Sequence, residues 1–175
     1  MTSYITINNS EVDPDSPITA DLMTKLRDNP IAVFTDDASV PADLKLGMRL
    51  LGTLTTTSGA SQTLSGLTLT LYKFIIVRLI GVSSTSNSTF RIQGGAGSTV
   101  DISDTMTNVS NLMHGEVSIE LASSNAWYIS SIGNTNSGTI VRVNLTSVTT
   151  AVTSLTFSPS GGTFDAGTIR VYGVR

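Results

Sequence analysis

Hydrophobic residues alternate with hydroxyl-bearing and charged residues through most of the chain after about Met48. The segment 117–121 reads Val-Ser-Ile-Glu-Leu, and the segment 140–145 reads Ile-Val-Arg-Val-Asn-Leu. Alternation of this kind is typical of a strand with one buried face and one face in water. Val, Ile and Thr, which are frequent here, are stiff side chains that pack well on a pleated surface. The pattern therefore predicts a protein made mainly of β-strands.

Clusters of Gly, Ser and Asn separate the apolar runs and set the expected strand boundaries. We expect strands at Met48–Thr56, Leu67–Leu71, Lys73–Val82, Thr89–Gln93, Gly115–Leu121, Ala126–Ile132, Thr139–Thr146, Thr153–Phe157 and Thr168–Val174. No helical pattern lies between them, so the strands should pair antiparallel. The predicted fold class is all-β: an antiparallel, jelly-roll-like β-sandwich. An immunoglobulin-like sandwich is the nearest competitor, but the Cys and Trp markers of that fold are missing.

One short N-terminal helix is expected at Ser16–Asn29. Ser16 suits the N-cap, Pro17 suits the first helical position, and Pro30 should end the helix. Ile18, Leu22 and Leu26 recur at intervals of four and predict an apolar stripe. About three turns of helix are marginal in water, so this stripe must be buried against something.

The chain is expected to divide into an N-terminal arm and helix at 1–46 and a β-sandwich at 47–175. An irregular connector, Asp36–Lys45, should join them. The helix has two candidate partners, another protein or its own sandwich. In the first case Ile18, Leu22 and Leu26 form a docking or oligomerisation surface.

Composition narrows the function classes. Only 13% of the 175 residues are charged, and the formal net charge is −3, with basic residues scattered singly. Such a chain has no run of Lys and Arg to neutralise phosphates, so nucleic acid is not an expected partner. The longest apolar run, Phe74 to Val82, is too short to cross a bilayer, and no secretion signal is recognisable, so synthesis in a cytoplasm is expected. The absence of cysteine excludes disulfides and cysteine ligands, and we expect no cofactor and no metal.

Candidate catalytic groups are few. His114 is the single histidine, and no Gly-x-Ser-x-Gly motif accompanies it, so a hydrogen-bonding residue at the start of a strand is favoured over a nucleophile-activating base. Glycoside hydrolysis would need two carboxylates in one cleft, and the chain offers Asp101, Asp104, Glu116, Glu120 and Asp165. A solvated surface explains these residues better, and we expect no enzymatic activity.

Trp127 and Tyr128 are candidates for carbohydrate contact. Adjacent strand residues point to opposite faces, so only one of the two can face the core. The other would present an aromatic ring on which a sugar can stack, although a buried anchor or a subunit contact is equally compatible with the sequence.

Two segments resemble structural proteins of tailed bacteriophages and gene transfer agents. They are the stretch from Asn9 to Ala32, with Val-Asp-Pro-Asp-Ser-Pro at 12–17, and the C-terminal stretch from Ser160 to Arg175. Leu69–Phe74 and His114-Gly115 extend the likeness into the middle of the chain.

The resemblance implies a virion protein with a jelly-roll domain, such as a head spike, head fibre, decoration protein or tail fibre. The leading expectation is a capsid (head) protein exposed on the particle surface and docked through its N-terminal region. The expected partners are other virion proteins and further copies of the chain, as a trimer or pentamer. A tail-fibre or receptor-binding module that binds host surface polysaccharide is the alternative. Either protein would be located on the virion, after assembly in the bacterial cytoplasm.

Overall fold

The chain folds into two compact units, Met1–Gly47 and Met48–Arg175. The computed structural model describes residues 3–34, 39–41, 47–106, 111–123, 126–135, 138–147 and 152–175. Most of the expected connector, Asp36–Lys45, lies outside these residues. The first unit contains a 3-10 turn, η1 (Asn9–Glu11), and one helix, α1 (Ala20–Phe34). No helix of the described chain is long and apolar enough to span a membrane.

Helix α1 begins and ends four or more residues later than the sequence predicts. Thr19, not Ser16, caps it, because the Thr19 hydroxyl accepts the backbone N–H of Leu22 at 3.1 Å. The Ser16 hydroxyl instead donates to the Ser10 carbonyl. Pro30 lies inside the helix rather than ending it. Ala32, half a turn beyond the proline, is fully buried, and this packing outweighs the local preference of proline to stop a helix.

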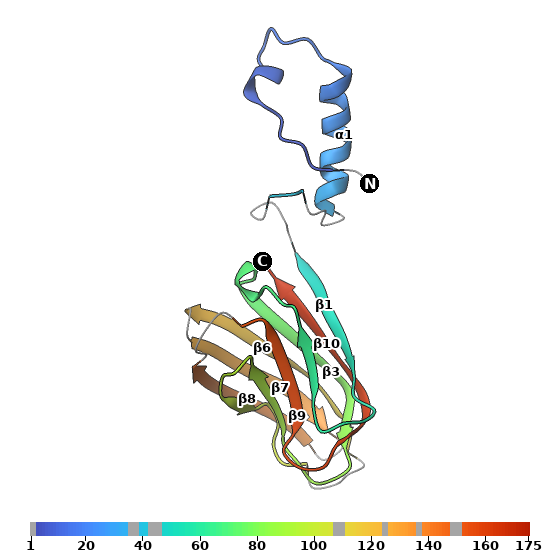
Figure 1. The fold of residues 1–175 in the computed structure, drawn as a ribbon, viewed down its shortest axis with the longest axis vertical. Helices are drawn as coiled ribbons and strands as arrows, with labels where there is room; N and C mark the ends of the chain where they lie inside the picture. The colour runs from blue at the N-terminus through green and yellow to red at the C-terminus, as the bar shows by residue number, and fades with distance from the viewer. Residues whose placement is uncertain are drawn as a thin grey trace. The chain divides into compact units, whose positions relative to one another are not determined.

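The second unit is an antiparallel sandwich of two sheets, which confirms the predicted fold class (Figure 1). Its elements are β1 (Met48–Thr55), β2 (Gln62–Ser65), η2 (Leu69–Leu71), β3 (Phe74–Ser84), β4 (Phe90–Gly94), β5 (Thr99–Asp101), β6 (Met113–Ser123), β7 (Ala126–Thr135), β8 (Gly138–Ser147), β9 (Ser154–Pro159) and β10 (Phe164–Val174). The larger sheet has the order β1-β10-β3-β6-β7-β8, and the smaller has the order β2-β9-β4-β5.

The pairing of the strands is that of a jelly roll with one added hairpin. With β7 and β8 set aside, eight strands remain, and they pair first with last and so on inward: β1 with β10, β2 with β9, β3 with β6 and β4 with β5. This is a long hairpin folded over on itself, which distributes its pairs between two packed sheets. The β7–β8 hairpin extends the larger sheet beyond β6.

Two strand predictions need correction. The predicted strand at Leu67–Leu71 is a 3-10 turn at Leu69–Leu71, and the strand itself is the more polar Gln62–Ser65. Leu67 and Leu69 are both buried, so their apolar spacing reflects packing in the core and not membership of a β-strand. Strand β5 was not predicted, since three residues are too few to show alternation.

The core lies between the two sheets and is tightest where a glycine faces an aromatic ring. Trp127 reaches across to Gly94, where an added Cβ would lie 2.4 Å from the indole. A Cβ added at Gly173 would likewise overlap the ring of Tyr72. Phe90 and Phe164 stack with their ring centroids 5.8 Å apart. Since the protein has no disulfide, this packing must hold the sandwich together.

We predict that Gly173→Ala lowers the free energy of unfolding by about 1–3 kcal/mol, because the new methyl group overlaps the Tyr72 ring. Denaturant unfolding of the full chain measures this. Gly161→Ala is the matched control, since its Cβ would meet nothing closer than the Ser86 hydroxyl at 3.4 Å. Equal stability of the two variants would contradict the close packing at Gly173.

Candidate interaction surfaces

The acidic residues considered for catalysis are mostly held by neighbouring side chains. Arg91 Nε donates to Asp101 at 2.8 Å, and Arg78 Nε donates to Glu116 at 3.3 Å. Asp165 accepts a hydrogen bond from the Ser83 hydroxyl. Glu116 and Glu120 do share one face of β6, as their spacing predicts. Asp101, Glu116 and Asp165 therefore each have a neighbouring side chain as their partner. Glycoside hydrolysis instead requires two carboxylates that face each other across a cleft.

Asp104 lies beside a hollow of about 140 Å³ at the end of the β7–β8 hairpin. Arg142 Nε donates to the Asp104 carboxylate at 2.9 Å. Of the acidic candidates, only Asp104 lines the hollow, which is otherwise formed by Thr105, Met106, Asn111, Thr135, Gly138 and Thr139. One carboxylate with an arginine partner does not supply both an acid and a base. Among the described residues, no group of three or more His, Cys, Asp or Glu side chains could hold a metal ion.

His114 lies near the start of β6 and is exposed. Its Nδ1 accepts the backbone N–H of Gly81 at 3.3 Å, where β3 and β6 change register. This contact matches the hydrogen-bonding role expected for a histidine at the start of a strand.

Trp127 and Tyr128 face opposite sides of the larger sheet, as adjacent strand residues must. Trp127 is buried against Gly94, whereas Tyr128 is 49% exposed. Of the two, only Tyr128 is therefore placed to contact a sugar from solvent. It lies on the outer face of β7, opposite Glu120 of β6.

The outer face of the larger sheet carries exposed apolar side chains in two patches. The first apolar patch lies on β1, β10 and β3 and consists of exposed Leu50 and Phe74 together with half-buried Tyr172 and Ile76. The second apolar patch lies on β7 and β8 and consists of Tyr128, Ile132, Val141 and Val143. Contiguous exposed apolar groups on a folded protein commonly mark an interaction site.

The second apolar patch was missed from the sequence because alternation in β8 runs opposite to the usual rule. Val141 and Val143 are 66% and 75% exposed, whereas Arg142 between them points to the other face of the strand and pairs with Asp104. The alternation at 140–145 was correct as a strand signal, but it does not say which of its two faces is buried. Arg142 lies on the opposite face of β8 and remains partly in solvent, with 32% of its side chain exposed beside Asp104.

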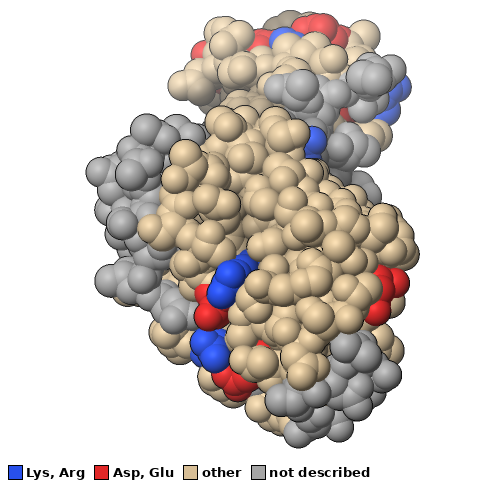
Figure 2. Space-filling model, turned by 60° about the horizontal axis from the view of Figure 1, so that its bottom comes forward, with Lys and Arg blue, Asp and Glu red and all other residues tan. Residues whose placement is uncertain are grey.

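Charged groups on the same outer face are few and of both signs. Among the described residues they are Arg78 and Arg170, which are basic, and Glu116 and Glu120, which are acidic. They lie between the two apolar patches, mainly on β3 and β6. Figure 2 shows one face of the molecule, on which uncharged residues cover most of the visible surface and basic groups lie beside acidic ones.

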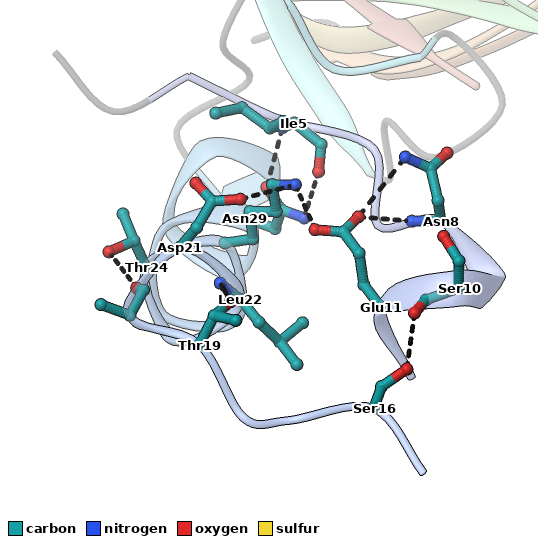
Figure 3. Close-up of polar contacts among 12 residues, drawn as sticks. Ile5, Asn8, Ser10, Glu11, Ser16, Thr19, Asp21, Leu22, Thr24 and Asn29 are labelled. Atoms are coloured by element: carbon teal, nitrogen blue, oxygen red, sulfur yellow. Dashed lines mark hydrogen bonds and ion pairs between the residues drawn. The ribbon is translucent and has the colours of Figure 1, made fainter. Parts of the chain in front are cut away.

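The N-terminal unit is held together mainly by polar contacts (Figure 3). Asn29 of α1 accepts the Ile5 N–H at 2.9 Å and donates to the Ile5 carbonyl at 2.8 Å, which fixes the extended arm to the helix. The described apolar residues that are buried here are Leu22, Ala32 and Val40. A unit with so little buried apolar surface has a small hydrophobic contribution to its stability.

Lys25 is the centre of this polar network. The Lys25 side chain is largely buried, and its ammonium lies 2.6 Å from Glu11 Oε1 and 2.9 Å from Asp21 Oδ2. The Asn8 backbone N–H donates to Glu11 and, together with Lys25, lowers the pKa of Glu11 below its ordinary 4.5. The hydrogen bonds to Glu11 and then to Asp21 raise the pKa of Lys25 above its ordinary 10.5. Both shifts favour the charged forms.

The structure separates the three residues of the expected docking stripe. Leu22 is buried, Leu26 is 51% exposed, and Ile18 precedes the helix and is 79% exposed. The exposed apolar strip of α1 is instead Met23, Leu26 and Pro30, at the helical spacing i, i+3 and i+7. Met23 was missed because the spacing of four selected Ile18, Leu22 and Leu26, and Pro30 was missed because it was expected to end the helix.

Comparison with known proteins identifies no family. No protein-family model matches the sequence, and no curated protein matches it. Among solved structures, the chain is similar to an exo-inulinase from Aspergillus awamori, with 14% identity and a TM-score of 0.30. The match covers 74% of this chain and 29% of the inulinase chain, so the chain spans less than a third of that enzyme. A similarity this low says nothing about what the present chain does.

We predict that acid loosens the N-terminal unit through Glu11. Because the pKa of Glu11 is lowered by folding, its contribution to stability is present above pH 4.5 and is lost as the pH falls through the folded value. Hydrogen exchange at the α1 amides, compared between the wild type and Glu11→Gln, measures this contribution. Protection should differ at pH 6 and converge near pH 3. An equal difference at both pH values would show that Glu11 is not the titrating group.

Proposed function

We propose that this chain is a structural protein exposed on the surface of a tailed phage or phage-like particle. In this role it is a capsid spike, fibre or decoration protein that docks through its N-terminal unit. The observation that carries the proposal is the character of that unit, which pairs its polar groups internally but leaves much of its apolar surface exposed. Such a surface suits a segment that completes its packing on a partner.

The exposed strip of α1 supports the docking role. Met23, Leu26 and Pro30 present a row of apolar groups along two turns of helix, in the arrangement by which a helix enters an apolar groove. Ile18 and Ile31 are exposed nearby in the sequence and extend the apolar surface available to a partner. The partner expected from this chemistry is an apolar groove on another virion protein.

The jelly-roll unit supports the exposed role. It buries a continuous core between its sheets and therefore does not depend on the N-terminal unit for apolar packing. Only 13% of all residues are charged, which lets surfaces meet other subunits without burying many unpaired charges. The two segments that resemble phage structural proteins belong to the N-terminal unit and to the region around β10, so both units contribute to the likeness. The proposed protein is a homo-oligomer, for which the resemblance favours a trimer or pentamer.

We predict that Leu26→Asp abolishes binding of the full-length protein to empty phage particles, because a carboxylate replaces an apolar contact of the docking strip. Co-sedimentation with the particles is the measurement. Leu26 is the suitable position because it is exposed, whereas Leu22→Asp would place a charge in the interior of the unit.

The control for this experiment is Thr24→Asp, which adds the same charge to the opposite side of the helix, where Thr24 is exposed. Unchanged binding by Thr24→Asp with loss in Leu26→Asp supports docking through the strip. Equal binding by both variants and the wild type rejects it.

The alternative function is a receptor-binding module for a host surface polysaccharide, and exposed Tyr128 is the observation that favours it. Under this alternative, the wild-type protein binds capsule or lipopolysaccharide fragments on a glycan array, and Tyr128→Ala removes the signal because the ring supplies the stacking surface. Ile132→Ala on the same face is the control. A wild type that binds no glycan rejects the alternative.

A further inference from the structure

We infer that the free edge of β8 pairs with the same edge of a second copy of this chain, antiparallel and about a two-fold axis. The larger sheets of the two copies then form one continuous sheet. Three features of β8 carry this inference: its contrast with the other sheet edges, the main-chain groups that it leaves unpaired, and its match to its own copy. The contact does not depend on the particle role, because it involves neither α1 nor any other part of the N-terminal unit.

Three of the four sheet edges have features that hinder pairing with another chain. Among the described strands, the edges are β1 and β8 in the larger sheet and β2 and β5 in the smaller (Figure 1). Strands β2 and β5 contain only four and three residues. Strand β1 is interrupted by a register shift between Leu50 and Gly52. Short strands and bulges are two of the ways in which proteins protect the edges of sheets.

Strand β8 has none of these features. It is ten residues long, and it pairs with β7 from Gly138 to Ser147 without a register shift. It contains no proline, and its one charged residue is Arg142. Arg142 Nε donates to Asp104 at 2.9 Å, so this charge is already paired within the chain. A long, regular edge with so little free charge is a template for a further strand.

The hairpin with β7 determines which main-chain groups of β8 are unpaired. Thr135 and Gly138 pair at the end of this hairpin, with two residues between them in the sequence. The closing pair of a two-residue loop exchanges both of its main-chain hydrogen bonds, and bonded positions alternate along the strand. The even positions of β8 therefore bond to β7. The N–H and C=O groups of the odd positions, from 139 to 147, point to the free edge.

A second β8 matches this edge when Val143 lies on the two-fold axis. Positions 139–147 of one copy then pair with positions 147–139 of the other, and the odd positions exchange about ten main-chain hydrogen bonds. A whole protein interface of standard size has about the same number. A register centred on Arg142 would give equal overlap, but it would place two like charges directly opposite each other. With Val143 on the axis, Arg142 lies opposite position 144 instead.

The side chains of the two copies match in this register. Because odd positions pair with odd positions, Val141 and Val143 of both copies share the outer face, whereas both Arg142 side chains lie on the other face. The exposed valines therefore lie beside apolar groups across the junction, and the second apolar patches of the two copies become continuous. An unrelated strand would have to reproduce this alternation, which a second copy has by identity.

The first test is the solution mass of the full-length protein by analytical ultracentrifugation over a range of concentrations. A strand of ten residues and a sheet about 10 Å thick give a contact of roughly 340 Å² on each copy, which is less than half of a standard interface. Association should therefore depend on concentration. The wild type is expected to approach twice the mass of one chain, in contrast to the trimer or pentamer expected from the sequence.

Val141→Pro is expected to weaken this association at least about tenfold, because proline removes an N–H group that points to the free edge. The hydrogen bonds between β8 and β7 do not use this group, so the sandwich is expected to stay folded. Val141→Thr is the matched control, since it keeps both the N–H group and a branched side chain. Circular dichroism checks the fold of each variant.

A disulfide cross-link tests the register. The chain has no cysteine, so one introduced cysteine can pair only with its equivalent in another copy. In Val143→Cys the two Cα atoms lie about 5.5 Å apart across the axis, which suits a disulfide, so mild oxidation should give a covalent dimer. Thr139→Cys is the control: it is exposed on the same strand, but its two copies lie roughly 27 Å apart. Cross-linking there should be at least about tenfold slower.

The outcomes separate this inference from the proposed function. Association that is weakened in Val141→Pro and kept in Val141→Thr, with faster cross-linking in Val143→Cys than in Thr139→Cys, supports the inference whether or not the protein binds particles. A wild type that stays monomeric at about 1 mM overturns it. So does association that Val141→Pro leaves unchanged, or equal cross-linking at the two positions. Loss of particle binding in Leu26→Asp bears only on the role of α1.

Discussion

The contact between Trp127 and Gly94 determines which side of the β7–β8 hairpin faces solvent. The indole lies where a side chain at position 94 would be, so β7 must point Trp127, and with it Ile129 and Ser131, toward the smaller sheet. Tyr128 and Ile132 then point outward, and the register of β8 against β7 carries Val141 to the same side. A shift of one residue would exchange the two faces of the hairpin. One tight contact in the core therefore creates the apolar patch at the surface.

The N-terminal unit depends on a different kind of interaction. Buried Lys25 is stabilised by Glu11 and Asp21, and Asn29 holds the arm by two hydrogen bonds to one residue. Polar contacts of this kind are directional and fix geometry well, but they contribute little net stability because the same groups bind water in the unfolded chain. The unit is therefore specified in shape without having a large core, which suits a segment that gains apolar contacts when it meets a partner.

The fold class could be predicted from the sequence because alternation and turn residues are local signals. The positions of β6 and β10 as strands follow from β-branched runs that no helix would favour. The start of α1 could not be placed, because Ser16 and Thr19 are both good caps and only the tertiary contact of Ser16 with Ser10 distinguishes them. The ion pair of Arg142 could not be predicted either, since Asp104 is 38 residues away and meets it only in the folded chain.

The pairing of β1 with β10 has a consequence for how the chain acquires its structure. Among the described strands, β1 has β10 as its one neighbour in the larger sheet, and β10 is synthesised after all the others. As the chain leaves the ribosome, β1 therefore waits unpaired until nearly the whole sandwich has been made. Closing so long a segment is slow, because its entropy is lost before the distant contacts form. During that interval the edges of β1 and β3 are open to pairing with other chains. Aggregation is therefore favoured when many incomplete chains are present at the same time.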